Sequence, residues 1–164
     1  MPFTPFHMGP GLLLKAVLGS SFSLMIFGWT QIIMDIQPLI VLITGEGHLH
    51  GFTHTYIGAS LLAILSALTG KHLSELALSV LQLSWVSSYK IKWPVAIVSA
   101  FIGSYSHVLL DSLMHSDLQP FYPLTVNNPF LDQISITLLH KLCLYSGMIG
   151  AVIYFVCRFI EKKA

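Results

Sequence analysis

The chain has 164 residues, of which 54% are hydrophobic and 9% carry a charge, and its formal net charge is +1. Soluble domains carry charge on about a quarter of their residues, so this composition excludes a soluble globular protein. So small a net charge also excludes binding to the phosphate backbone of a nucleic acid, which needs a dense basic patch. The composition predicts an all-α membrane protein in one domain, residues 1–164, with four or five membrane helices.

The N-terminal part of the chain predicts short or broken elements before the first full span. Met1–Pro10 contains three prolines and is not expected to be helical throughout. Gly11–Leu18 is apolar but too short to cross about 30 Å of hydrocarbon, so it is interfacial or the first part of a broken helix. Residues 21–44 are long enough to span and contain Asp35. An ionisable residue in such a segment is functional by default, the alternative being a pair with a neighbouring helix.

A glycine-rich loop, residues 45–51, precedes the rest of the helices. Thr53 is the expected N-cap of the next helix, which places His54 in its first turn. Gly70-Lys71-His72 is expected to separate two helices, and the basic, aromatic stretch Lys90–Pro94 follows the second. The predicted helices are Tyr56–Thr69, Leu73–Tyr89, Val95–His115 and Ile134–Ile160, with a loop at Ser116–Asn128.

The distribution of lysines predicts an orientation in the membrane. Lys162 and Lys163 follow the last span, and Lys90 and Lys92 lie two spans earlier. Cytoplasmic loops carry an excess of Lys and Arg. We therefore expect these four residues in the cytoplasm and the loop 116–129, which has no Lys or Arg, on the outside.

One predicted helix carries several ionisable side chains on a single face. His107, Asp111 and His115 are spaced i, i+4 and i+8, so they lie one above another. Two imidazoles flanking a carboxylate can hold a divalent metal, whereas the alternative is a buried hydrogen-bonded pair that only ties helices together. An ionised Asp in a membrane needs a cation or strong donors nearby, which favours the metal for His107 and Asp111. Asp111 can also orient a ligating imidazole.

Eight histidines accompany seven acidic residues, and several of the histidines cluster, which favours metal chemistry. Glu46 is the predicted general base beside a metal-activated water, although an exposed loop glutamate is the commoner case. His48 and His50 are expected to be solvated, and Asp117 to lie at a helix exit. The predicted metal ligands are His7, Asp35, His54, His107, Asp111 and His115, with Asp111 also catalytic, and the expected ion is zinc, with manganese or iron as alternatives.

The order of these residues is similar to that of a known family. The matching positions are His7, Asp35 shortly before a proline, Thr53-His54, His107-x3-Asp111 and Tyr122-Pro123. They resemble the family of LexA-binding, inner-membrane-associated metal-dependent hydrolases. The resemblance implies an integral protein of the bacterial inner membrane whose His and Asp residues hold a catalytic metal.

The chain departs from the family pattern at three places. A single Asp35 replaces an acidic pair, Thr55 replaces the serine after Thr-His, and His48 and His50 lie where a basic residue is common. The spacing 107-111-115 is also similar to the helix motif of zinc-dependent phospholipases C and related single-strand nucleases. That similarity implies phosphoester hydrolysis by two metal ions.

The predicted helices impose a geometric condition on a shared site. If segments 54–70, 73–89 and 95–115 all span, His54 and His115 end on opposite sides of the membrane. One segment must then be short, tilted or non-spanning, and 73–89, with its polar side, is the candidate.

The leading functional hypothesis is a membrane-embedded metal-dependent hydrolase in which a metal-activated water attacks a phosphoester or ester, such as that of a lipid. The expected partners are membrane lipids and a lipid or phosphoester substrate, with no nucleic acid, and the sequence does not define the oligomeric state. The same residues suit a metal or proton transporter. The third hypothesis is a non-catalytic membrane scaffold or regulator whose polar residues hold helices together.

Overall fold

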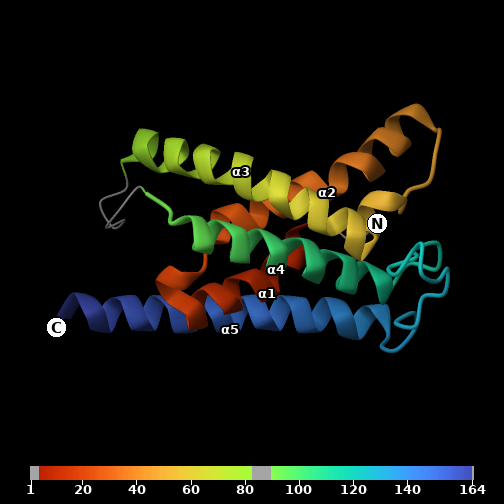
Figure 1. Cartoon of the computed structure of the whole chain (residues 1–164). Helices are drawn as coiled ribbons and strands as arrows, with labels where there is room; N and C mark the ends of the chain where they lie inside the picture. The colour runs from red at the N-terminus through yellow and green to blue at the C-terminus, as the bar shows by residue number, and fades with distance from the viewer. Residues whose placement is uncertain (1–3, 83–89, 164) are drawn as a thin grey trace.

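The computed structural model describes residues 4–82 and 90–163, and this part of the chain is all helical (Figure 1). Four helices, α2 to α5, are long and apolar enough to cross a membrane, which confirms the predicted polytopic all-α fold. The shorter α1 is the short element expected before the first span. The elements are α1 (Thr4–Leu18), η1 (Gly19–Ser21), α2 (Leu24–Thr44), η2 (Phe52–His54), α3 (Tyr56–Leu81), α4 (Trp93–Ser112) and α5 (Ile136–Lys163), with η denoting a 3-10 turn.

The outer faces of the long helices are apolar, as a bilayer requires. On α5, Val152, Phe155 and Phe159 expose 64%, 70% and 60% of their surfaces. Large apolar side chains in such a continuous band are unfavourable in water but suit contact with lipid tails. The four long helices therefore form a membrane bundle.

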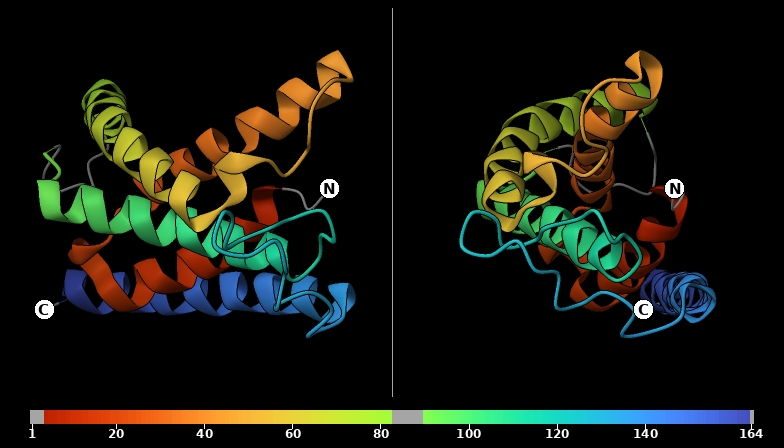
Figure 2. Two further views of the ribbon diagram at one scale, coloured as in Figure 1. Left: turned by 45° about the vertical axis from the view of Figure 1, so that its right-hand side comes forward. Right: turned by 90° about the vertical axis from the view of Figure 1, so that its right-hand side faces the viewer.

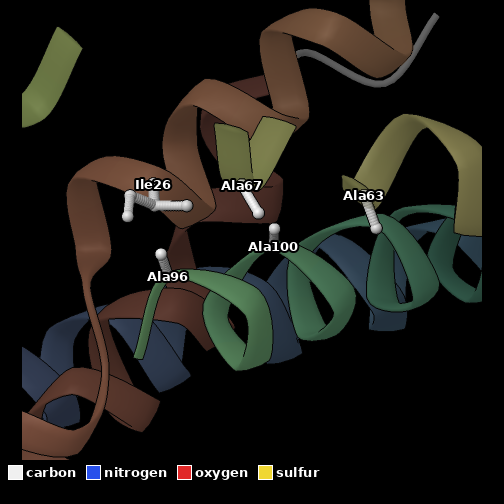
Figure 3. Packing of buried hydrophobic residues seen from close by; sticks show 5 residues of the cluster. All are labelled: Ile26, Ala63, Ala67, Ala96 and Ala100. Carbon is white, nitrogen blue, oxygen red and sulfur yellow. The ribbon is translucent and has the colours of Figure 1, made fainter. Parts of the chain in front are cut away.

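Helices α2, α3 and α4 approach closely because small residues line their shared interface. Ala63 and Ala67 of α3 and Ala96 and Ala100 of α4 are buried against Ile26 of α2, and Figure 3 shows these side chains pointing toward one another. The alanines recur at four-residue spacing, so they form a stripe along one face of each helix. In lipid, such close van der Waals contact is a main source of helix association.

Helix α1 lies alongside α5 (Figures 1 and 2), and glycines set the distance between them. A Cβ on Gly150 would lie 2.5 Å from the backbone nitrogen of Leu13, and one on Gly147 would lie 3.1 Å from the Cα of Gly9. The two helices thus touch nearly backbone to backbone, as small residues allow in membrane proteins. Through this contact α5 holds in place the helix that carries His7.

Helix α1 continues through two prolines that were expected to break it, so that prediction is wrong from Thr4 onward. Pro5 lies in the first turn, where a backbone N–H has no partner within the helix. Pro10 lies further inside and removes one hydrogen bond, the one to the carbonyl of Phe6. Packing against α5 stabilises α1 despite this loss.

Helix α3 runs unbroken over Tyr56–Leu81, so the predicted break at Gly70-Lys71-His72 is wrong. Gly70 is a close-packing residue, because a Cβ there would lie 2.8 Å from Cδ1 of Trp29 on α2. The Lys71 ammonium donates to Glu75 one turn later at 2.5 Å, which keeps this polar stretch helical. Residues 83–89 of the second predicted helix lie outside the described residues.

Helix α3 begins at Tyr56, as predicted, but its N-cap differs from the predicted one by two residues. Thr55 is the N-cap, since its Oγ1 accepts the backbone N–H of Gly58 at 2.9 Å. The assignments of Thr53 as N-cap and of His54 to the first helical turn are therefore wrong. His54 belongs instead to η2. The backbone N–H of His54 donates to the carbonyl of Gly51 at 3.0 Å, which is a hydrogen bond of this 3-10 turn.

Because α3 is a single span, His54 before its start and His115 after the end of α4 lie at the same end of the bundle (Figure 1). The condition that segment 73–89 be non-spanning no longer applies. Basic residues gather toward the opposite end, at or near the ends of α1 and α5 and before α4: Lys15, Lys90, Lys92, Arg158, Lys162 and Lys163. The positive-inside rule assigns that end to the cytoplasm and the His54 end to the outside, in agreement with the orientation expected from the sequence.

This orientation predicts which positions react from outside the cell. In a background with Cys143 and Cys157 replaced by alanine, we expect Asn127→Cys to react with a membrane-impermeant maleimide in intact spheroplasts. Lys90→Cys is the matched position at the other end, and we expect it to react only after permeabilisation. Labelling of Lys90→Cys before permeabilisation would reverse the orientation.

The glycine contact predicts a large effect from one substitution on α5. Gly150→Leu places side-chain atoms where the backbone of Leu13 lies, so we expect a loss of about 1–3 kcal/mol in the free energy of unfolding. Thermal or denaturant unfolding in detergent, followed by circular dichroism, measures the change. Val152→Leu, on the lipid-facing side of the same helix, should leave stability unchanged. Equal stability of both variants would contradict the proposed packing.

Candidate metal centre

Five of the predicted ligands come together from four separate segments. They are His7 on α1, Asp35 on α2, His54 in η2, and His107 and Asp111 on α4. His7 and Asp111 each expose 2% of their surface, and His54 and His107 expose none. The side chain of Asp35 is 31% exposed. The group, called the inner centre below, is thus buried on most sides.

Helix α4 places two of these residues by continuing its small-residue stripe. Ala96 and Ala100 pack near the start of the helix, and Gly103 lies one turn further along, where a Cβ would be 3.0 Å from Cβ of Thr30 on α2. The same face then carries His107 and Asp111. The small residues bring α2 and α4 together, and the polar residues meet at the outer end of that contact.

The Asp111 carboxylate lies at the middle of the inner centre. Its Oδ1 is 3.4 Å from Nε2 of His7, and its Oδ2 is 3.2 Å from Nε2 of His107 and 3.6 Å from Nε2 of His54. The Nε2 atom of His107 is also 3.4 Å from Oδ1 of Asp35. Three imidazoles and two carboxylates therefore lie close together, in two overlapping groups that share His107.

The other ring nitrogen of His107 is occupied, which fixes the tautomer of the ring. Gln31 donates from its Nε2 to the carbonyl of Gly103 at 3.0 Å, so its Oε1 is an acceptor. The Nδ1–H of His107 donates to this oxygen at 2.9 Å. A neutral imidazole protonated at Nδ1 keeps a lone pair on Nε2, and here that lone pair faces Asp111.

His54 is oriented in the same way by a short chain of polar groups. Its Nδ1 lies 3.0 Å from Oγ1 of Thr53, whose hydroxyl donates to Oε1 of Gln37. The Thr53 oxygen is therefore the acceptor for His54 Nδ1–H, and Nε2 keeps its lone pair. Burial is the largest cause that lowers the pKa of His54, to about 3, so the ring is neutral at neutral pH.

Several buried polar atoms of the inner centre lack a hydrogen-bond partner within the described part of the chain. They are both nitrogens of His7, Nε2 of His54, Nε2 of His107 and Oδ1 of Asp111. Buried polar atoms are nearly always satisfied, so such a group is unusual. Lone pairs that face a carboxylate repel it unless a cation lies between them.

The distances also suit a bound cation. Ligand atoms about 2.0–2.1 Å from a tetrahedral zinc ion lie about 3.3–3.4 Å from one another. The N–O distances to the Asp111 and Asp35 carboxylates are 3.2–3.6 Å. The donor set therefore fits a divalent ion that accepts imidazole and carboxylate ligands.

The remaining predicted residues lie elsewhere. Glu46 is exposed in the loop after α2, where its backbone N–H donates to Oγ1 of Thr44 at 3.3 Å, and it belongs to none of the metal-competent groups among the described residues. Its assignment as general base has no geometric support. His48 is exposed, as expected. His115 lies outside the inner centre, in a second group with His50 and Asp117. The expectation that His50 is solvated is wrong, because its side chain is only 8% exposed.

Sequence reasoning did not identify Gln31, Thr53 or Gln37 as positioning residues. Gln31 could have been found, because it precedes Asp35 by four residues and so shares its face of α2. The role of Gln37 depends on the path of the loop that returns to η2, and periodicity does not predict that path.

The matched sequence family agrees with this membrane architecture. Residues 12–163 match the sequence profile of the YdjM inner membrane protein family, a range that includes all four membrane helices and every inner-centre residue except His7. Comparison with curated proteins and with solved structures found no match. A match over nearly the whole chain, together with four apolar helices, shows that this protein belongs to the YdjM inner membrane protein family and is an integral protein of the inner membrane.

Proposed function

We propose that this protein is a metal-dependent hydrolase that cleaves an ester or phosphoester bond at the outer side of the membrane. The observation that carries the proposal is the set of unpaired, buried imidazole and carboxylate atoms around Asp111. A hydrogen-bonded network is the competing structural explanation. It would need a protonated imidazole that donates to Asp111, and Nε2 of His7, His54 and His107 makes no hydrogen bond within the described part of the chain.

The roles of the residues follow from these contacts. Asp111, His7, His54 and His107 would hold the ion, and Asp35 closes the group from α2. Zinc suits this set best, with manganese or iron as alternatives. A bound divalent ion supplies Lewis acidity and lowers the pKa of a water molecule, which gives a nucleophile at neutral pH. Gln31 and Thr53 keep the imidazoles oriented, as outer-shell partners of metal sites do.

An apolar groove beside the inner centre supports a lipid-like substrate. The groove has a volume of about 420 Å³ and is lined by Tyr56, Phe101, Ile102, Tyr105, Ser106 and Leu109. Ser106 adjoins His107 in the sequence, and Tyr56 follows η2, so the groove borders two segments that supply ligands. An acyl chain would fit such an apolar lining.

A transporter would use the same residues differently. A relay would have to continue from the inner centre toward the cytoplasmic end, where Ile26, Ala67 and Ala96 form a tightly packed apolar cluster (Figure 3). This packing favours chemistry at one side of the membrane.

Metal content is the first prediction of this proposal. We expect the unmodified protein, purified in detergent without a polyhistidine tag, to contain bound zinc, manganese or iron. The His107→Ala variant should contain one ion fewer. Gln31→Leu removes the acceptor for His107 Nδ1–H and the donor to the carbonyl of Gly103, but none of the proposed ligands, so we expect about 10–100-fold weaker binding of that ion. Elemental analysis after dialysis against metal measures both effects.

The control variant is His72→Gln, an exposed histidine on α3, which should bind metal as the unmodified chain does. Circular dichroism shows whether each variant keeps its helices. Two results would contradict the proposal. One is unmodified protein that folds and binds no metal, and the other is a folded His107→Ala variant with unchanged metal content.

Hydrolysis itself is tested with Asp111→Asn. We expect the metal-loaded protein in mixed micelles to release product from at least one member of a panel of phospholipids and carboxylic esters. Because Asp111→Asn removes a central ligand, the rate of product release should fall by more than the about 10–100-fold that follows the loss of an outer-shell partner. Asp132→Asn, on the exposed loop before α5, is the matched control. Metal-dependent ion flux in liposomes, with no cleavage of any panel member, would favour transport instead.

A further inference from the structure

A second group of polar side chains lies at the outer edge of the inner centre. His50 comes from the loop before η2, and His115 and Asp117 come from the turn after α4. One ligand atom from each lies within 4.8 Å of the other two. The side chain of His50 is 8% exposed and that of Asp117 is 52% exposed. The group therefore joins a nearly buried imidazole to a carboxylate that water can reach.

The contacts within this group orient its donors. The two carboxylate oxygens of Asp117 accept from Nδ1 of His50 at 2.9 and 3.0 Å. The rings of His50 and His115 stack with their centroids 4.2 Å apart and an interplanar angle of 29°. The Nε2 atom of His115 is buried and has no hydrogen-bond partner in the described part of the chain. This buried nitrogen, an oriented imidazole and a carboxylate together offer ligand atoms for a metal ion.

The outer group, His50, His115 and Asp117, is built next to two of the four segments that supply the inner centre. His50 precedes His54 by four residues, and His115 follows Asp111 by four. The backbone N–H of His115 donates to the carbonyl of Asp111 at 2.9 Å, so one helical turn separates them, a rise of about 6 Å. The rings of His50 and His54 meet edge to face with centroids 5.1 Å apart. The outer group thus lies between the inner centre and water.

We propose that His50, His115 and Asp117 form a second metal site, which binds a divalent ion of the zinc class from the outer aqueous side. Two imidazoles and a carboxylate suit zinc and neighbouring transition metals, whereas calcium and magnesium prefer oxygen ligands. The site uses none of the ligands of the inner centre, so it does not depend on the proposed hydrolase. A hydrogen-bonded latch that closes the loop over the centre is the competing structural explanation.

Zinc titration of full-length protein without a polyhistidine tag tests the second site. After removal of metal with a chelator, the protein is dialysed against increasing free Zn²⁺ and its bound metal is measured. We expect two ions for the unmodified chain. Asp117→Asn should weaken binding of one ion by at least about tenfold, and the pair His50→Gln with His115→Gln should abolish it. His48→Gln, an exposed histidine in the same loop, is the matched control.

The Asp111→Asn variant distinguishes the two sites experimentally. It should lose the ion of the inner centre and keep the ion of the outer site. Binding that disappears in the outer variants and persists in Asp111→Asn supports the second site even if the hydrolase proposal fails. The second site would be overturned if the unmodified protein binds a single ion and that ion behaves as an inner-centre ion. It would then persist in folded Asp117→Asn and in the folded double variant, and disappear in Asp111→Asn. Substitution with Co²⁺ gives an optical spectrum that reports the two sites independently of activity.

Discussion

The constraint on which the rest of this structure depends is the burial of the Asp111 carboxylate among three imidazoles. A carboxylate removed from water carries a large desolvation cost unless strong partners compensate it. Here its neighbours are His7, His54 and His107, at distances of 3.2–3.6 Å that form no hydrogen bond. Hydrogen bonds from Nδ1 to Thr53 and Gln31 orient the rings of His54 and His107, so that Nε2 of each faces the carboxylate. A bound cation would explain this arrangement electrostatically, and so would a proton that makes one imidazole a cation beside the carboxylate.

The scaffold holds this arrangement through close backbone contacts. Small residues let α3 and α4 approach α2, and glycines let α1 lie against α5. Each of these contacts positions a different ligand: α4 carries two, α2 carries one, and α1 brings His7 from the N-terminal side. Because lipid tails compete with apolar side chains as neighbours, such fitted contacts are more specific than general hydrophobicity in a membrane. The inner centre and the packing of the bundle are therefore linked.

The sequence predicted the parts of the centre that depend on local spacing. His107 and Asp111 share a face because of their four-residue separation, and Asp35 is conspicuous in an apolar segment. The continuity of α3 could not be predicted in this way, because Gly70 has the character of a helix breaker in isolation and its contact with Trp29 is visible only in three dimensions. The same applies to His50, whose burial depends on the turn after α4 meeting the loop before η2.

The continuity of α3 has the largest consequence for function. With two helices between residues 56 and 89, the histidines at 54 and 115 would lie on opposite sides of the membrane, and a shared site would need a non-spanning segment. With one helix they lie together at the end opposite most of the basic residues. The titratable groups then form a layered site, with an enclosed inner centre and a more exposed outer group about one helical turn apart. Such layering suits a centre that receives its ion and its substrate from one side, because the cytoplasmic half of the α2–α4 interface is packed with apolar side chains.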